Sequence, residues 1–400
     1  MRPIRLFDQN AYQKSFTAAI VDQKQVADCF HVILDKTAFY PESGGQPSDR
    51  GALNNAPVHD VIEQDDTIVH VLKSPMEKGS TVTGRIDWAR RFDHMQQHTG
   101  QHILSQSFVQ IAKAETIGFH LGTQICTIDL DRSGLSEAVI QQVENAANRI
   151  VMENRMVHVH RVQPEEVPRF NLRKAPVTKE VVRIVEIKGF DANGCCGTHV
   201  KSTGEVGPIK ILRQEKYKGG SRITFVCGFR ALGDYQKKQR LTNEVAVILN
   251  SSEDEIIENL KRRQSERKRD QKRFKFLNQR LLESESKDLM KEAQELESCK
   301  LILKSYSDRT PSELQQLARL LVQNEQTVVL LGCKDDKAHI VLACHSNMKF
   351  DMNGVLQEVI PLIEGRGGGT KQIAQGNGPL VANLDGLLSK VRERMVHGLP

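Results

Sequence analysis

Residues 235–305 contain neither proline nor glycine, and Lys, Arg, Glu, Gln and Leu dominate this stretch. Such a composition favours long helices, because the two residues that most disfavour a helix interior are missing. Its middle, residues 261–275, is rich in Lys and Arg and has almost no apolar side chain before Phe274. A chain of 400 residues interrupted in this way must consist of separate parts joined by a helical, partly coiled-coil segment.

The remainder of the chain shows three patterns. Residues 1–88 carry short alternating apolar runs broken by Gly, Pro, Asn and Asp, which predicts a small β-barrel or meander. Residues 89–228 mix helical with strand-like stretches, which predicts an α+β domain. After a helical segment at 229–305, residues 306–400 have a compact α/β pattern. We therefore expect an α+β multidomain protein with these four parts.

The composition of the chain indicates its cellular location and the redox state of its cysteines. Charged residues make up 26% of the chain and hydrophobic residues 39%, with a net charge of +6, which fits a soluble protein with an anionic partner. No apolar run reaches the roughly 18–20 residues of a membrane span, and the N-terminus turns polar before a signal core could form. We expect a cytoplasmic location with no membrane partner. The eight Cys are then reduced thiols that are buried, catalytic or metal-bound.

Two pairs of metal-ligating residues stand out. His98 and His102 are four residues apart on a predicted helix, so both imidazoles can reach one ion. Cys195 and His199 repeat this spacing across a turn that contains Gly197. Three His and one Cys thiolate suit a tetrahedral Zn²⁺ site, and this donor set disfavours Mg²⁺ and Ca²⁺. The sequence therefore predicts that two segments about a hundred residues apart meet around zinc.

Two neighbours offer alternatives to these ligands. His94 lies four residues before His98 on the same predicted helix, although a surface position also fits it. Cys196 could replace Cys195, but only Cys195 repeats the four-residue spacing to His199. Each pair alone is weak support for a metal, because helical His pairs are commonly surface residues and adjacent Cys are commonly buried thiols.

Together these motifs resemble a known signature. His98-Thr-Gly-Gln-His102 with Cys195-Cys-Gly-Thr-His199 is similar to the zinc motif of the editing domains of alanyl- and threonyl-tRNA synthetases. It resembles even more closely the free-standing alanyl-tRNA editing proteins of the AlaX family. The resemblance implies a long-form member with a zinc-containing editing domain and a C-terminal DHHA1-type domain. Further similar stretches are residues 39–49, 203–211, 219–223 and 367–378.

The resemblance implies a hydrolase that deacylates tRNA(Ala) mischarged with serine or glycine, acting in trans at zinc. A pocket shaped for alanine admits glycine and discriminates only weakly against an added hydroxyl, so a second site must remove the wrong ester. Serine is larger than alanine, so that second site must hydrogen-bond the seryl hydroxyl. Zinc could activate water or hold the substrate amine, and the sequence leaves both open. The candidate catalytic and reading residues are Gln46, Thr99, Gln101 and His120.

Two positions depart from the family pattern. Ser43 stands where the family often has the first of three Gly, and Gln101 stands where the synthetase often has Thr. Both changes concern the amino-acid preference more than the type of reaction.

The C-terminal half is expected to contact RNA. Arg366, Gly367, Gly368 and Lys371 belong to a predicted Gly-rich turn, whose backbone amides could approach phosphates or bases. The basic run at 261–275 is a second candidate, although a solvated helix face fits it equally well. The resemblance also implies a homodimer formed through this half.

Other functions remain open. A non-catalytic tRNA-binding module with a structural zinc is the main alternative. We expect a free-standing protein rather than a synthetase fragment, because no stretch resembling an adenylation domain precedes the predicted barrel. A DHH-type phosphoesterase is disfavoured, because Asp93-His94-Met95 is the nearest approach to an Asp-His-His motif.

Overall fold

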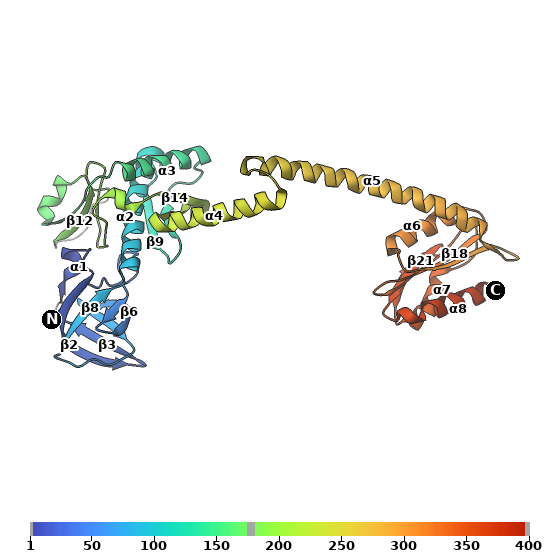
Figure 1. Ribbon diagram of the computed structural model, residues 1–400, viewed down its shortest axis with the longest axis horizontal. Coiled ribbons are helices and arrows are strands. Elements are labelled where there is room, and N and C mark those ends of the chain that lie inside the picture. Colours follow the sequence, from blue (N-terminus) through green and yellow to red (C-terminus); the bar gives the residue numbers. More distant parts are fainter. Residues whose placement is uncertain (1–2, 174–180, 397–400) are drawn as a thin grey trace. The chain divides into compact units, whose positions relative to one another are not determined.

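The computed structural model describes residues 3–173 and 181–396 (Figure 1). Two compact units, Met1–Ile248 and Leu249–Pro400, divide the chain, and each contains both helices and sheets. This confirms the multidomain α+β class, while the finer division into four domains stays a prediction. Among the described residues, no helix has the length and apolar character needed to cross a membrane.

Six strands of the first unit close into a barrel in the order β2-β3-β7-β6-β5-β8. Side chains alternate between interior and solvent along them, as in β8. Gly84 is required here, because a Cβ on it would meet the Phe16 ring at 2.3 Å. The strands are β2 (Ser15–Val26), β3 (Cys29–Leu34), β5 (Gly51–Leu53), β6 (Ala56–Gln64), β7 (Thr67–Leu72) and β8 (Thr81–Ile86); β1 (Ile4–Arg5), α1 (Leu6–Gln9) and β4 (Lys36–Thr37) lie beside them in sequence.

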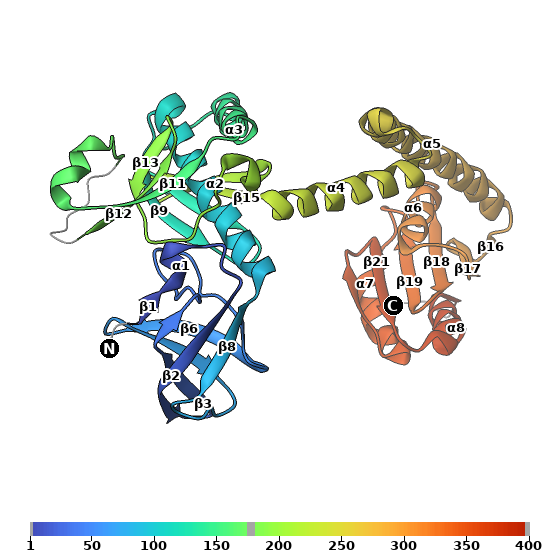
Figure 2. The same cartoon turned by 60° about the vertical axis from the view of Figure 1, so that its left-hand side comes forward.

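Helix α2 (Trp88–Ala112) follows β8 directly and runs from the barrel into the second part of this unit (Figures 1 and 2). Asp87 caps it by accepting a hydrogen bond from the Arg90 amide at 3.1 Å. The helix packs with α3 and a four-stranded antiparallel sheet, β14-β15-β10-β9, around a core that includes Phe108 and Phe225. These elements are α3 (Glu137–Met152), β9 (Thr116–Leu121), β10 (Cys126–Leu130), β14 (Ile209–Tyr217) and β15 (Gly220–Cys227).

A three-stranded antiparallel sheet, β11-β12-β13, completes the part of the first unit that positions the site. Its strands are β11 (Val157–Val162), β12 (Val182–Ile187) and β13 (Asp191–Gly194), accompanied by the short helices η1 (Pro164–Arg169) and η2 (Thr203–Val206). Residues 195–199 follow β13 and contact α2, where the Cys195 sulfur lies 3.3 Å from Nε2 of His98.

A buried ion pair joins the barrel to α2. The Arg91 guanidinium contacts the Asp49 carboxylate, and both side chains are fully buried. Arg91 also donates to the backbone oxygens of Ala11 at 2.7 Å and Ala38 at 2.6 Å. Asp49 in turn accepts the Tyr40 amide at 2.6 Å. The pair therefore has hydrogen-bond partners on both sides, which a buried charge pair needs in order to be tolerated.

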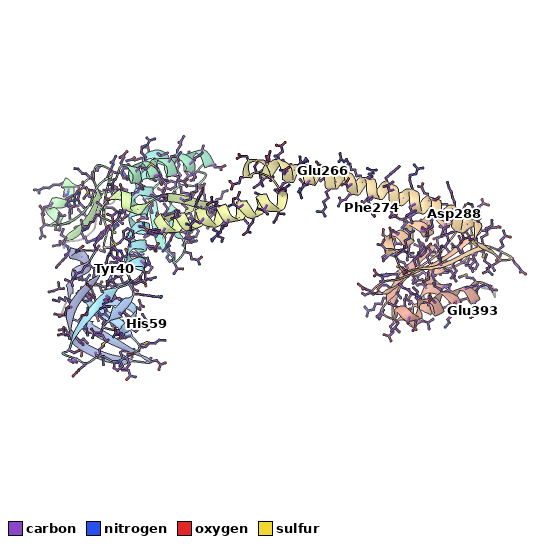
Figure 3. All side chains as sticks on the ribbon, in the orientation of Figure 1. Tyr40, His59, Glu266, Phe274, Asp288 and Glu393 are labelled. Carbon is purple, nitrogen blue, oxygen red and sulfur yellow. The ribbon has the colours of Figure 1, made fainter. Side chains whose placement is uncertain are left out.

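The Pro- and Gly-free segment includes most of α4 (Gly228–Leu249) and all of α5 (Ile256–Lys291), which are separated by η3 (Glu253–Glu255). Ser252 and Glu255 form a capping box before α5, with the Ser252 hydroxyl 2.9 Å from the Glu255 carboxylate. Most of α5 is exposed, including Phe274, which Figure 3 labels. The expectation of helix up to residue 305 is wrong, because Gln294–Glu295 and Lys300–Tyr306 are strands β16 and β17.

The second unit is built on a six-stranded sheet, β16-β17-β18-β19-β21-β20 (Figure 2). Alternate residues of β18 point to opposite faces: Val328 and Leu330 pack with α7 and α8, while Val329 and Leu331 pack with α6 and the end of α5. The elements are α6 (Pro311–Leu321), β18 (Thr327–Lys334), β19 (Ala338–Cys344), α7 (Met352–Val359), η4 (Ile360–Ile363), β20 (Arg366–Gly369), β21 (Ile373–Gly378), η5 (Val381–Asn383) and α8 (Leu384–Val396).

The Gly-rich stretch is a β-hairpin rather than the predicted turn. Strands β20 and β21 pair antiparallel, with Gly367 opposite Gly376. A Cβ on Gly367 would lie 2.4 Å from the Gln375 oxygen and 2.6 Å from the Gly376 Cα. Glycine is therefore needed for close contact between the two backbones.

Candidate metal centre

Four side chains from two distant segments converge in the first unit. Helix α2 supplies His98 and His102 from one face, and the segment after β13 supplies Cys195 and His199. Their ligand atoms all lie within 4.8 Å of one another. The Cys195 sulfur is 3.3 Å from Nε2 of both His98 and His199. The three His are buried.

Local backbone features allow this convergence. The turn that carries Cys195 and His199 passes directly over His98, and a Cβ at Gly197 would lie 2.1 Å from that ring. Gly197 is therefore required by this close contact, because any side chain would collide with the His98 ring.

Each His of the cluster has a separate oxygen next to its Nδ1 atom. Nδ1 of His98 lies 2.9 Å from the Gln46 amide oxygen, and Nδ1 of His199 lies 3.1 Å from the Thr99 hydroxyl. Nδ1 of His102 lies 3.4 Å from an Asp191 carboxylate oxygen. Neutral imidazoles that hold their proton at Nδ1 present the Nε2 lone pair to a metal, and an acceptor oxygen next to Nδ1, such as that of Gln46, favours this tautomer.

The charge states inside the cluster depend on one another. Burial lowers the pKa of His199 to about 3 and would lower that of His102, but the Asp191 carboxylate and Cys195 raise the pKa of His102 above its usual value. Burial would raise the pKa of Cys195, but the His98 and His199 imidazoles outweigh it and hold the pKa well below its usual value. A thiolate among imidazoles is the form in which these residues ligate a metal.

This donor set fits zinc. Three imidazole nitrogens and one thiolate are borderline to soft ligands, and four converging protein ligands match a tetrahedral shell. The ordered oxygens behind the His rings complete the outer shell that zinc sites usually have.

A cavity of about 550 Å³ opens onto the cluster. Its wall includes Gln101 and Thr116, and both side chains donate to the Ser105 hydroxyl, at 2.8 Å and 2.7 Å. We call these three residues the polar wall. The other lining residues include Ser43, Gly44, Ile117, Gly118, Phe119, Arg173, Asn193 and Cys196.

The four predicted catalytic and reading residues have different surroundings. Gln101 lines the cavity. Gln46 is fully buried and uses its amide on His98 and Thr198, so it supports a ligand rather than facing a substrate. Thr99 likewise supports His199. His120 is exposed on β9 and is not among the cavity's lining residues.

Sequence reasoning missed several residues of this centre. Asp191 and Thr116 carry no motif of their own, and only the fold brings them to the site. Thr116 and Ser43 both line the cavity, and Ser43 is one of the two departures from the family pattern. The rival ligands lie outside the cluster. His94 is buried, with its pKa lowered to about 3 by burial and nearby arginines, and Cys196 is exposed.

A second cavity, of about 470 Å³, lies in the C-terminal unit. Arg366, Gly367 and Gly368 line it, whereas Lys371 does not. Three of the four predicted RNA-binding residues thus share one surface. The further polar lining residues are Gln315, His339, Gln375 and Asn377.

Comparison with known families matches three parts of this architecture. Residues 182–224 match the second additional domain of threonyl- and alanyl-tRNA synthetases, which carries half of the metal cluster. Residues 6–90 match the class II (A) tRNA synthetase model, and residues 299–397 match the DHHA1 domain. Editing-type and DHHA1 domains are therefore both present.

Individual relatives extend the similarity over 93% of the chain. The alanyl-tRNA editing protein AlaX-L of Pyrococcus horikoshii is 30% identical over 93% of this chain and 94% of its own length. The editing protein Aarsd1-B of Xenopus laevis is 35% identical over 59% of this chain and 58% of its own. The alanine–tRNA ligase of Pyrococcus abyssi is 31% identical over 93% of this chain, which spans only 41% of that enzyme.

The chain belongs to the AlaX-L family of alanyl-tRNA editing proteins.

Proposed function

We propose that this protein hydrolyses the aminoacyl ester of tRNA(Ala) mischarged with serine or glycine, acting in trans in the cytoplasm at a zinc ion held by the His98, His102, Cys195 and His199 cluster. The single observation that carries this proposal is that four converging metal ligands lie at a cavity of about 550 Å³. The names of the relatives, alanyl-tRNA editing proteins, support the substrate class.

The chain's own residues shape the reaction around that ion. Zinc supplies Lewis acidity when bound, either to a water or to the substrate amine. Gln46 and Thr99 hold the His98 and His199 imidazoles by hydrogen bonds, so the geometry of these two ligands is restricted before substrate arrives.

The polar wall is our candidate for reading the seryl hydroxyl. Gln101 and Thr116 line the cavity and are anchored by the same Ser105 hydroxyl, so their remaining hydrogen-bonding capacity can face a ligand. A seryl hydroxyl would pair with this wall, whereas an alanyl methyl would leave it desolvated and unpaired. Such an asymmetry spares correctly charged tRNA although alanine is smaller than serine.

The other parts of the chain are proposed to hold the tRNA. The Arg366–Gly368 cavity and the basic stretch of α5 present positive charge to the phosphate backbone. Phe274, Leu277 and Leu281 form an exposed apolar stripe along α5, with exposed fractions of 68%, 54% and 54%. We propose that this stripe forms the homodimer contact expected from the sequence.

The test is the rate of hydrolysis of Ser-tRNA(Ala), Gly-tRNA(Ala) and Ala-tRNA(Ala), measured with and without a zinc chelator. We expect hydrolysis of the seryl ester, slow hydrolysis of the alanyl ester, and loss of activity with chelator. The rate for the glycyl ester, which also lacks a hydroxyl, shows whether the polar wall alone decides which esters are hydrolysed. Binding of tRNA(Ala) without turnover of any ester would instead support the alternative, a tRNA-binding module with a structural zinc.

The polar wall is tested in the same assay. Thr116→Val keeps the shape of the side chain and removes its hydroxyl. We expect the ratio of kcat/KM for Ser-tRNA(Ala) to that for Ala-tRNA(Ala) to fall about tenfold or more, because one hydrogen bond specific to serine is lost. An unchanged ratio in both Thr116→Val and Gln101→Ala would remove the wall from the proposal.

A further inference from the structure

In the first unit, a smaller recess adjoins the metal-centre cavity. Its volume is about 290 Å³, and it shares Ser43, Arg183 and Cys196 with the wall of the larger cavity. The two spaces are thus separated by only a few side chains. Neither the proposed hydrolysis nor the zinc ligands account for this recess.

Three arginines from three strands converge on the recess: Arg5 from β1, Arg161 from β11 and Arg183 from β12. Arg161 and Arg183 lie directly opposite each other in the antiparallel register of β11 and β12. Like charges in such cross-strand pairs destabilise a sheet, so their juxtaposition calls for an anion between them.

The side chains that line the recess include fewer carboxylates than guanidinium groups. Arg5 pairs with Glu63, which leaves Asp8 to serve both other arginines. Its carboxylate lies 2.8 Å from an Arg161 nitrogen and 3.6 Å from Nε of Arg183. With three guanidinium groups and two carboxylates among its lining residues, the recess holds an excess of one positive charge.

Arg183 has unused hydrogen-bonding capacity. Its Nη1 donates to the backbone oxygen of Cys195 at 2.5 Å, which fixes the side chain against a predicted metal ligand. Its Nε is buried and has no hydrogen-bond partner among the described residues. A buried donor of this kind is costly unless a ligand completes it.

We propose that this recess binds the phosphate nearest to the aminoacyl ester, the 5′-phosphate of the terminal ribonucleotide of the RNA. This inference rests on the proposed function, which places the ester in the neighbouring cavity. The ester and this phosphate are carried by the same ribose, so the phosphate must lie in a space that adjoins the ester site. Guanidinium groups match phosphate oxygens in geometry and in charge.

The experiment compares two small substrates that differ by one phosphate, 3′-O-seryl-adenosine and its 5′-monophosphate. In the unaltered protein we expect KM for the phosphorylated ester to be about tenfold lower, with similar kcat. Arg161→Gln should reduce this KM advantage to less than twofold. Arg161 is 54% exposed, so the substitution is compatible with folding.

The matched control is Arg169→Gln. Arg169 is also an exposed arginine paired with a carboxylate, Glu166, but it does not line the recess. This variant should keep the full KM advantage. No advantage in the unaltered protein, or the same advantage in Arg161→Gln, would overturn the subsite.

A binding measurement separates this inference from the proposed function. Equilibrium dialysis with AMP and adenosine needs no turnover. Preference for AMP that disappears in Arg161→Gln supports the subsite even if neither ester is hydrolysed, in which case only the proposed hydrolysis fails. Equal binding of AMP and adenosine contradicts the subsite whatever the enzyme's activity.

Discussion

The amide oxygen of Gln46 lies 2.9 Å from Nδ1 of His98, although 52 residues separate them in sequence. The same oxygen accepts the Thr198 amide at 3.1 Å, and the Gln46 nitrogen donates to the Thr198 hydroxyl at 2.9 Å. These contacts fix which end of the amide faces His98. The barrel loop that contains Gln46 thereby orients His98 on α2 and also the turn that carries two further ligands, Cys195 and His199.

Replacing Gln46 tests this orienting role. Gln46→Leu removes the acceptor for His98, and we expect zinc affinity to fall about 10- to 100-fold, the usual effect of losing an outer-shell partner. Gln46→Glu keeps acceptor oxygens for His98 and Thr198 and should retain most of the affinity. Competition with a chromogenic chelator measures both variants, and equal affinity in Leu and Glu variants would contradict the role.

The ligand assignment is tested by the two adjacent cysteines. Cys195→Ala should abolish both bound zinc and deacylation, because it removes one of four ligands. Cys196→Ala is the matched control and should keep zinc at one ion per chain, since the Cys196 side chain is exposed and outside the cluster. Elemental analysis of the purified variants gives the answer, and His102→Ala should behave like Cys195→Ala.

The barrel is predicted to lose stability in mild acid because of His70. This residue is fully buried, with its ring nitrogens 2.8 Å from the Thr37 hydroxyl and 3.1 Å from the Val32 oxygen. Burial lowers the pKa of His70 to about 4. Since the unfolded chain binds this proton at the usual pKa of about 6.5, the stabilisation is complete above pH 6.5 and is lost as pH falls towards 4.

The loss from His70 amounts to about 3 kcal/mol between these limits. Urea unfolding at several pH values measures it. His70→Gln cannot titrate, so its free energy of unfolding should fall less steeply between pH 6.5 and 4 than that of the unaltered protein. Parallel pH profiles for the two proteins would show that His70 does not contribute.

Two glycines of the C-terminal unit should respond in opposite directions to the same substitution. Gly367→Ala places a Cβ 2.4 Å from the Gln375 oxygen and should destabilise the hairpin by about 1–3 kcal/mol. Gly386 lies in helix α8, and a Cβ there would meet no atom within 4 Å. Gly386→Ala should therefore raise the free energy of unfolding by about 0.5–1 kcal/mol. Urea unfolding followed by circular dichroism compares them, and the same sign for both variants would contradict the packing.

Much of the metal centre follows from local sequence. The four-residue spacing of His98 and His102 needs only a helix to become a shared face, and α2 spans both residues. Asp191 could not be anticipated in this way. It acts on His102 only because β13 and α2 meet, and nothing in its local sequence marks it as a partner.

The prediction of secondary structure is wrong where it relies on composition instead of on the periodicity of apolar residues. The composition of residues 300–305, which lack Pro and Gly, predicts a helix, but Leu301 and Ile302 are buried on opposite faces of a strand that pairs with β18. This pairing with β18 is long-range, and a single sequence does not display it.

The buried pair of Arg91 and Asp49 makes the N-terminal barrel inseparable from the helix that follows it. A shortened protein that begins at residue 89 would remove every hydrogen-bond partner of the Arg91 guanidinium, namely the Asp49 carboxylate and the Ala11 and Ala38 oxygens, and would expose the face of α2 that now packs on the barrel. The predicted boundary at residue 88 is therefore not a position at which the chain can be divided into two stable parts. A fusion protein that contains this editing domain should also contain the barrel.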